Sequence, residues 1–253
     1  MMLGFDLELI EKLNIDVPVI APTGSHLICV GGTGSGKSTA LIYFLYKCGC
    51  DTGTLDLWIC DAKNSGEFEG ISSHYATGSD CGCVIEAFRD LCQTLPEGGN
   101  GKVHILLVDE IAGLLTLLST NKDGKAEADR VRAAMAYILM IGRSRRCFLW
   151  LAMQRYTATI FPASSGAADN FQVCIGLGRL TVDGRKGLFA GEHFDGEEDL
   201  NFGRGRGLVL IDGQPLRGLV IPEASKARLR ALIQRDSAAC RAERRRAPPC
   251  EAT

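Results

Sequence analysis

The sequence has no apolar run long enough to cross a bilayer. Its longest apolar stretches, Leu114 to Leu118 and Phe148 to Met153, fall far short of the roughly 18 to 20 residues that a membrane-spanning helix needs. The N-terminal segment MMLGFDLELIEKLN carries acids where a secretory signal carries bases, and no apolar core follows it. We therefore predict a cytoplasmic protein without direct membrane insertion, and leave open its recruitment to a membrane by a partner.

Proline is also scarce, with 8 residues against 30 glycines, which indicates many tight turns and few stiff linkers. The sequence contains no internal repeat, and 46% hydrophobic residues are enough to bury a full core. These features exclude a disordered, collagen-like or disulfide-stapled small protein. We expect one globular domain over residues 1–223, followed by a basic C-terminal helix and tail over residues 224–253.

The 11 cysteines lack the Cys-x-x-Cys spacing that is common in zinc sites. Several lie inside apolar runs, where a reduced thiol acts as a small hydrophobic group, and we favour this interpretation. The alternative is a metal site built from two Cys-x-Cys pairs and a histidine, namely Cys48, Cys50, Cys81, Cys83 and His74.

The formal net charge of −2 is unevenly distributed along the chain. Residues 224–253 carry eight basic and three acidic side chains, a local charge of +5, which leaves −7 for residues 1–223. Such a basic segment either binds nucleic acid or an acidic partner, or is a solvated helix face.

Apolar, strand-like runs alternate with helix-like segments, and the apolarity of the runs is continuous. This pattern predicts an α/β fold whose mainly parallel sheet is buried on both faces by helices. Two runs separated by Asp-Gly-Gln-Pro, residues 207–211 and 216–220, predict a hairpin at the sheet edge. The expected strands are 27–30, 55–60, 103–108, 147–153 and 171–176, and the expected helices are 38–47, 84–95, 111–118, 127–141, a segment ending near 190, and 224–246.

The segment VGGTGSGKST, between the first strand and the first helix, satisfies the pattern G-x-x-x-x-G-K-[ST]. This pattern predicts a P-loop, whose backbone N–H groups surround phosphates at a helix N-terminus. We expect Lys37 to reach the β- and γ-phosphates and Ser38 to bind Mg²⁺. The predicted nucleotide contacts are Gly32, Thr33, Gly34, Ser35, Gly36, Lys37, Ser38 and Thr39.

A buried run, VHILLVDEI, ends in Asp109 and Glu110. We expect Asp109 to hold the Mg²⁺ and Glu110 to polarise the attacking water, although adjacent acids also begin many helices. A further strand, FLWLAMQR, ends in Gln154. If this strand lies between the other two, Gln154 lies beside Glu110 and senses the γ-phosphate; otherwise it is an ordinary polar residue at a strand end.

Five segments between Pro18 and Pro222 carry a family resemblance: HLICVGGTGSGKST, DAKNSGEFEGI, HILLVDEI, GRSRRCFLWLAMQR and GRGRGLVLIDGQPLRGLVIP. In their residue types and in their order along the chain, these segments resemble those of the FtsK/HerA superfamily of DNA-pumping ATPases, and most closely those of the FtsK/SpoIIIE motor domain. Kinases and small GTPases lack the strand that ends in glutamine. The chain lacks the transmembrane region and winged-helix domain of FtsK, and Tyr156 stands where the family has proline, which favours a compact motor from a mobile genetic element.

The resemblance implies a RecA-like P-loop NTPase core of the ASCE type that forms a homo-oligomeric, usually hexameric ring. ATP and Mg²⁺ would bind between subunits, with Lys37, Glu110 and Gln154 catalytic, and DNA would pass through the pore. Arg143 matches an arginine that coupling-type relatives insert into the neighbour's site, where it stabilises the transferring phosphoryl group. Its rivals are Arg145, Arg146, Arg155, Arg179 and Arg185.

Two loops are candidates for DNA contact, residues 119–125 with Lys122 and Lys125, and residues 155–165. The charge of −7 does not exclude DNA, because ring symmetry multiplies each phosphate contact. Both loops are equally well explained as solvated connections. The sequence leaves the strandedness of the DNA open.

The leading hypothesis is an ATP-hydrolysing DNA translocase of a mobile genetic element or conjugation system. The alternative is a coupling or adaptor ATPase that recruits a DNA–protein substrate, such as a DNA-bound relaxase, to a membrane secretion channel through the basic tail. A nucleotide-binding protein without turnover is a third hypothesis. The intact Lys37, Asp109, Glu110 and Gln154 argue against it.

Overall fold

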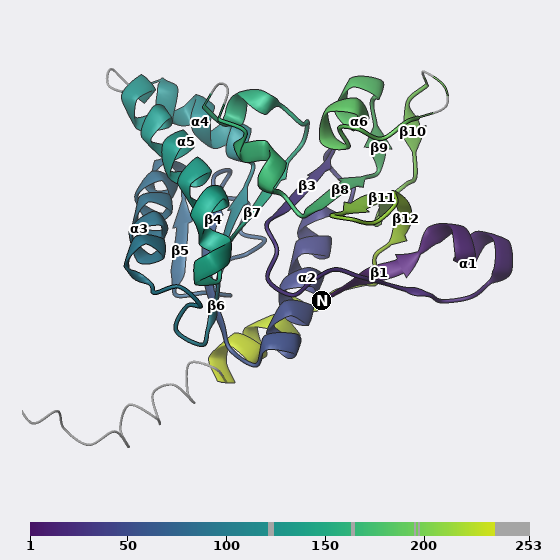
Figure 1. Ribbon diagram of the computed structural model, residues 1–253, viewed down its shortest axis with the longest axis horizontal. Helices are drawn as coiled ribbons and strands as arrows, with labels where there is room; N and C mark the ends of the chain where they lie inside the picture. The colour runs from purple at the N-terminus through teal and green to yellow at the C-terminus, as the bar shows by residue number, and fades with distance from the viewer. Residues whose placement is uncertain (121–123, 163–164, 195, 197, 236–253) are drawn as a thin grey trace, which may run out of the picture.

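One mixed sheet of ten strands runs through the computed structural model (Figure 1), which describes residues 1–120, 124–162, 165–194, 196 and 198–235. The strand order is β2-β1-β12-β11-β8-β3-β7-β6-β4-β5, and the six strands from β8 to β5 pair in parallel. The strands are β1 (Met2–Asp6), β2 (Pro18–Ile20), β3 (Leu27–Gly31), β4 (Leu55–Asp61), β5 (His74–Thr77), β6 (Val103–Asp109), β7 (Cys147–Met153), β8 (Val173–Leu177), β11 (Arg206–Ile211) and β12 (Arg217–Val220). A separate small pair consists of β9 (Arg179–Leu180) and β10 (Leu200–Asn201).

Helices cover both faces of the parallel part of the sheet (Figure 1). The α-helices are α1 (Leu7–Leu13), α2 (Lys37–Thr52), α3 (Cys81–Thr94), α4 (Ile111–Ser119), α5 (Gly124–Ile141) and α6 (Val182–Leu188), and residues 226–235 are also helical. Short 3₁₀ turns occur at η1 (Gly78–Asp80), η2 (Gly142–Arg145), η3 (Ala158–Ile160) and η4 (Ala167–Asn170). Within the described residues no helix has the length and apolarity to span a bilayer.

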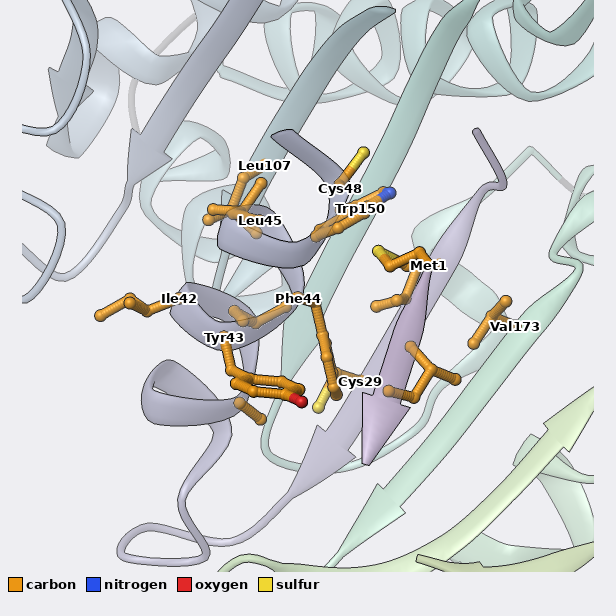
Figure 2. Close-up of a cluster of buried hydrophobic side chains, with 14 of the residues drawn as sticks. Met1, Cys29, Ile42, Tyr43, Phe44, Leu45, Cys48, Leu107, Trp150 and Val173 are labelled. Atoms are coloured by element: carbon orange, nitrogen blue, oxygen red, sulfur yellow. The ribbon is translucent and has the colours of Figure 1, made fainter. Parts of the chain in front are cut away.

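Successive residues of the central strands pack against opposite layers. Cys29 packs with α2, whereas its neighbour Ile28 belongs to the cluster with α3, α4 and α5. Figure 2 shows the α2 side, where Phe44 and Trp150, both at most 1% exposed, belong to one buried cluster. Burying a large apolar side chain contributes about 1.5–3 kcal/mol, so the two layers fix the central strands and the loops at their ends. The predicted α/β class, with a mainly parallel sheet buried on both faces, is confirmed.

The predicted C-terminal hairpin forms, but the expectation that it lies at the sheet edge is wrong. β11 and β12 pair antiparallel, and β1 then pairs with β12, with Phe5 opposite Val220. The edge strand on this side of the sheet is β2. An inner strand presents two sides for hydrogen bonding, and the N-terminal segment occupies the side of β12 that the sequence analysis left free.

Three predicted boundaries also differ. α5 begins at Gly124, so Lys125 lies in its first turn and not in a loop, while Lys122 lies outside the described residues. The candidate loop 155–165 contains η3, and residues 163–164 are outside the described part. The closing helix, expected over 224–246, runs from 226 to 235 in the described residues, where Leu229 is fully buried, and the predicted remainder lies outside them.

Candidate active site

The P-loop connects β3 to α2 with its open side toward solvent. Gly34 and Gly36 have φ angles of +80° and +95°, which side chains with a Cβ rarely adopt. Gly36 caps α2 without a side-chain hydrogen bond, and the first N–H groups of an α-helix have no partner within the helix. The loop therefore offers free backbone donors and the positive end of the helix dipole, the surroundings that a phosphate group requires.

Lys37 and Ser35, both in the P-loop, differ in what their side chains can contact. The Nζ of Lys37 donates to the carbonyl oxygens of Gly31 (2.6 Å) and Gly32 (3.2 Å), so the ammonium group lies at the mouth of the loop. Ser35 is only 7% exposed, and its carbonyl accepts from the N–H of Gly205 (2.9 Å). The Ser35 hydroxyl is buried and its N–H donates to the carbonyl of Gly32 (3.2 Å), so Ser35, although predicted as a nucleotide contact, does not line the cleft.

Asp109 lies at the carboxyl end of β6, directly beside Asp61 at the end of β4. Burial, followed by the charge of Asp61, raises the pKa of Asp109 from 3.8 to about 6, while Lys37 acts in the opposite direction. A buried carboxyl group of this kind is stabilised in its charged form by a cation, and carboxylate and hydroxyl oxygens are ligands that Mg²⁺ accepts. Asp109 and the half-buried Ser38 therefore fit a magnesium ion.

Glu110 follows β6 in a left-handed conformation, with φ 60° and ψ 56°. Its N–H donates to the carbonyl oxygen of Ala152 (2.9 Å) in β7, which holds the backbone at this point. The Glu110 carboxylate forms an ion pair with Lys63, with 2.8 Å between Nζ and Oε2. A left-handed conformation costs a residue other than glycine roughly 1–2 kcal/mol, and residues strained in this way concentrate at functional sites.

Gln154 follows β7, and β7 lies between β3 and β6 as the sequence analysis required. Gln154 is exposed to the same cleft as Glu110 and the P-loop. The cleft has a volume of about 360 Å³, and its lining residues are Thr33, Gly34, Gly36, Lys37, Ser38, Thr39, Lys63, Ser65, Glu67, Asp109, Glu110, Gln154 and Arg204. A larger cavity of about 580 Å³ lies beside β8 and β11 and contains none of these groups.

Lys63 and Arg204 were not predicted as site residues. Lys63 is the second residue after β4. Because the carboxyl ends of parallel strands meet at one edge of a sheet, this position alone could have predicted that Lys63 lies at the cleft. Arg204 lies next to Gly205, which hydrogen-bonds the P-loop, and only the tertiary fold brings it to the cleft.

Arg143 lies in η2, before β7, whereas Gln154 follows the other end of that strand. Seven residues of strand separate the ends by about 23 Å, so Arg143 does not reach the cleft of its own subunit. Its side chain is exposed and makes no hydrogen bond or ion pair with other described residues. Three of the alternative arginines already bind partners within the subunit. Arg145 donates to the carbonyl of Cys92, and Arg179 forms an ion pair with Asp199. The buried Arg185 donates to the carbonyls of Gly196 and Glu198.

The residues of the alternative zinc site do not gather in the described structure. Cys48 is buried on α2 and Cys81 on α3, while the His74 ring stacks on Trp58 at 4.0 Å between centroids. Across the described residues, no three His, Cys, Asp or Glu side chains are placed to share a metal ion. The described cysteines are free thiols.

No protein-family model matches the sequence, and neither does any curated protein. Solved structures do match. The pCW3 conjugation coupling protein TcpA, in a monomer form with ATPγS, is 16% identical, with a TM-score of 0.67 over 92% of this chain and 73% of that chain. The cytoplasmic domain of the Thermomonospora curvata type VII secretion ATPase EccC is 17% identical, with a TM-score of 0.61 over 93% of this chain and 30% of that chain.

EssC (ATPases 2 and 3) from Geobacillus thermodenitrificans is 13% identical, with a TM-score of 0.63 over 98% of this chain and 50% of that chain. The chain thus spans at most half the length of the EccC and EssC chains. These matches show that the chain shares its fold with ATPases, so the α/β fold implied by the motif resemblance is confirmed.

Proposed function

We propose that this chain is an ATP-hydrolysing motor of a conjugation or secretion system and that it translocates DNA. The observation that carries the proposal is the single cleft that joins the P-loop, the Asp109–Glu110 pair and Gln154. The P-loop offers donors for phosphates, and the acids offer a place for a cation and a base for water. This combination is what phosphoryl transfer to water requires.

The residues have distinct roles in the proposed reaction. Lys37 and the backbone N–H groups of the P-loop bind the β- and γ-phosphates of ATP. Ser38 and Asp109 would hold Mg²⁺, which neutralises charge on the phosphates. Glu110 accepts a hydrogen bond from the attacking water and orients it toward the phosphorus atom. Gln154, at the end of the neighbouring strand, is close enough to the cleft to report whether the γ-phosphate is present.

The conjugation or secretion setting is supported by two of the neighbours, which are a conjugation coupling protein and a type VII secretion ATPase. We place the protein in the cytoplasm, where ATP is supplied, and propose a ring, with six subunits as the leading number. In such a ring, Arg143 of one subunit reaches the cleft of the next. The exposure of its side chain and its lack of hydrogen-bond or ion-pair partners among the described residues support this role.

A second function is a coupling ATPase whose main task is to recruit a DNA-bound protein to a membrane channel. Arg228 and Arg235, the exposed basic residues of the described C-terminal helix, favour it, because exposed cationic side chains suit an acidic partner. The described cleft serves both functions equally well, so the difference lies in what stimulates hydrolysis.

The test is ATPase activity measured alone, with naked single- or double-stranded DNA, and with a relaxase–DNA complex. A translocase is expected to be stimulated severalfold by naked DNA of one kind, at a salt concentration that is stated and varied. Stimulation only by the relaxase complex would support the coupling function instead. The Lys37→Ala variant is the control, and hydrolysis by that variant would reveal a contaminating ATPase.

A further inference from the structure

The ion pair between Lys63 and Glu110 occupies the group that the proposed reaction needs. Oε2 of Glu110 lies 2.8 Å from Nζ of Lys63 and is therefore engaged in a charge-assisted hydrogen bond. Glu110 has a side chain only 10% exposed, whereas that of Lys63 is 45% exposed. A carboxylate held in this way is a poorer acceptor for the hydrogen of a water molecule than a free one.

The position of Lys63 is built by the loop that follows β4. The buried Asp61 accepts from the N–H groups of Ser65 and Gly66, both at 3.0 Å, and also from the hydroxyls of Ser65 (3.1 Å) and Tyr75 (3.0 Å). The carbonyl of Asp61 accepts from the N–H of Asn64 (3.0 Å). These bonds close a tight turn around residues 61–66, so the base of the Lys63 side chain is fixed at the cleft.

The opposite side of the same loop is attached to the C-terminal helix. Nζ of Lys226 donates to the carbonyl of Gly66 (2.9 Å), and the Arg230 guanidinium donates to the carbonyl of Glu69 (2.8 Å). Leu229, between them, is fully buried. The loop therefore has contacts on both sides, and the freedom that remains to Lys63 lies in its long side chain.

We propose that Lys63 is a positioning residue that holds the Glu110 carboxylate until the γ-phosphate of ATP enters the cleft. The ammonium group of Lys63 then leaves the carboxylate and binds that phosphate. The inference rests on the proposed binding of ATP in this cleft. Of the two partners, Lys63 is the one able to move, because the Glu110 backbone is fixed by its left-handed conformation and by the bond to Ala152. Both side chains line the cleft, so a γ-phosphate competes directly with the carboxylate for the ammonium group.

The exchange makes the base available only when there is a phosphate to attack. ADP lacks the γ-phosphate, so the ion pair between Lys63 and Glu110 stays intact when ADP binds. ATP carries the γ-phosphate and breaks the ion pair. Lys37 does not serve this purpose, because its Nζ is bound to the P-loop carbonyls and not to Glu110.

The first measurement is the rate at which acetic anhydride modifies each lysine, followed by mass spectrometry, in wild type and in the Glu110→Gln variant. In wild type, Lys63 should be protected without nucleotide, with MgADP and with Mg²⁺ and a non-hydrolysable ATP analogue. In Glu110→Gln it should react at least threefold faster without nucleotide and with MgADP, and regain protection with the analogue alone. Lys47, which lies over the Tyr43 ring outside the cleft, is the control and should not change.

The second measurement is nucleotide affinity by calorimetry. Lys63→Met should weaken the binding of the ATP analogue about tenfold, equivalent to about 1.4 kcal/mol of binding free energy, and change the affinity for ADP by less than about twofold. Lys63→Arg, which keeps the charge, should restore most of the loss. Lys47→Met is the matched control and should leave both affinities unchanged.

Three results would overturn the inference: equal Lys63 reactivity in wild type and Glu110→Gln, no protection of Lys63 by the analogue in that variant, or equal loss of ADP and analogue affinity in Lys63→Met. If the wild-type protein binds neither nucleotide, the proposed function fails together with the inference. If it binds both and Lys63 does not discriminate between them, only the inference fails.

Discussion

Asp109 is expected to destabilise the nucleotide-free protein at neutral and alkaline pH. The residue is 9% exposed, and burial together with Asp61 raises its pKa from 3.8 to about 6. Between these values the folded state binds more protons than the unfolded state, so the free energy of unfolding falls as the pH rises through this range. By pH 8 the loss is complete and amounts to about 3 kcal/mol at most.

The Asp109→Asn variant removes this titration and should therefore stabilise the protein while it abolishes hydrolysis, a trade of activity for stability. Since 1 kcal/mol changes Tm by about 2–4 °C in a chain of this size, we expect Tm to rise by about 6–12 °C at pH 8. At pH 4.5 the rise should be about a third as large.

The assay is thermal unfolding across this pH range without nucleotide or Mg²⁺. Asp90→Asn is the control, because Asp90 is exposed and, among the residues that the structure describes, pairs only with the neighbouring Arg89; it should show no such pH dependence. A Tm difference between Asp109→Asn and wild type that is the same at pH 4.5 and pH 8 would refute the reasoning, since the amide would then act through packing and not through the removal of a buried charge.

Three further predictions concern the proposed reaction. Lys37→Ala should remain folded and lose ATP affinity, and calorimetry showing unchanged binding would contradict the P-loop assignment. Glu110→Gln should bind ATP but hydrolyse it at least about a hundredfold more slowly, because a base that orients water contributes at the transition state; near wild-type turnover would transfer that role to Glu67. ATPase activity per subunit should rise with protein concentration, and mixing Arg143→Ala with Glu110→Gln subunits should restore part of it. Co-assembly without recovery would exclude Arg143 as the arginine that acts across the interface.

The sequence was sufficient to predict the parts of the site that depend on local order. The P-loop lies between a strand and a helix in one continuous segment, and its glycine spacing alone requires the turn that the structure contains. The Asp109 and Gln154 strands were predicted as buried runs, and their residues meet because parallel strands end at one edge of the sheet. A single assumption about strand order was therefore enough to predict that Gln154 and Glu110 lie at the same cleft.

The parts that were missed depend on short strands and on register. β1, β2 and β5 have 5, 3 and 4 residues, too few for a periodic pattern to stand out from its surroundings. Lys63 and Glu110 are 47 positions apart and meet only because β4 and β6 pair with Asp61 opposite Asp109. A shift of that register by one residue would turn the side chains of the shifted strand to the other face of the sheet, so Asp61 and Asp109 would no longer lie side by side.

The C-terminal helix connects two parts of the chain that the sequence presented as separate. Its basic character suggested a docking element, and the P-loop with its acids suggested an ATPase site, with nothing to join them. In the structure, Lys226 and Arg230 bind the backbone of the loop that carries Lys63. Asp61 holds the near side of that loop through the N–H of Gly66, while the helix holds the far side. A ligand that displaces the helix would therefore remove two of the bonds that fix the loop bearing Lys63. In the proposed coupling function, the helix would therefore be connected to Glu110 through this one loop.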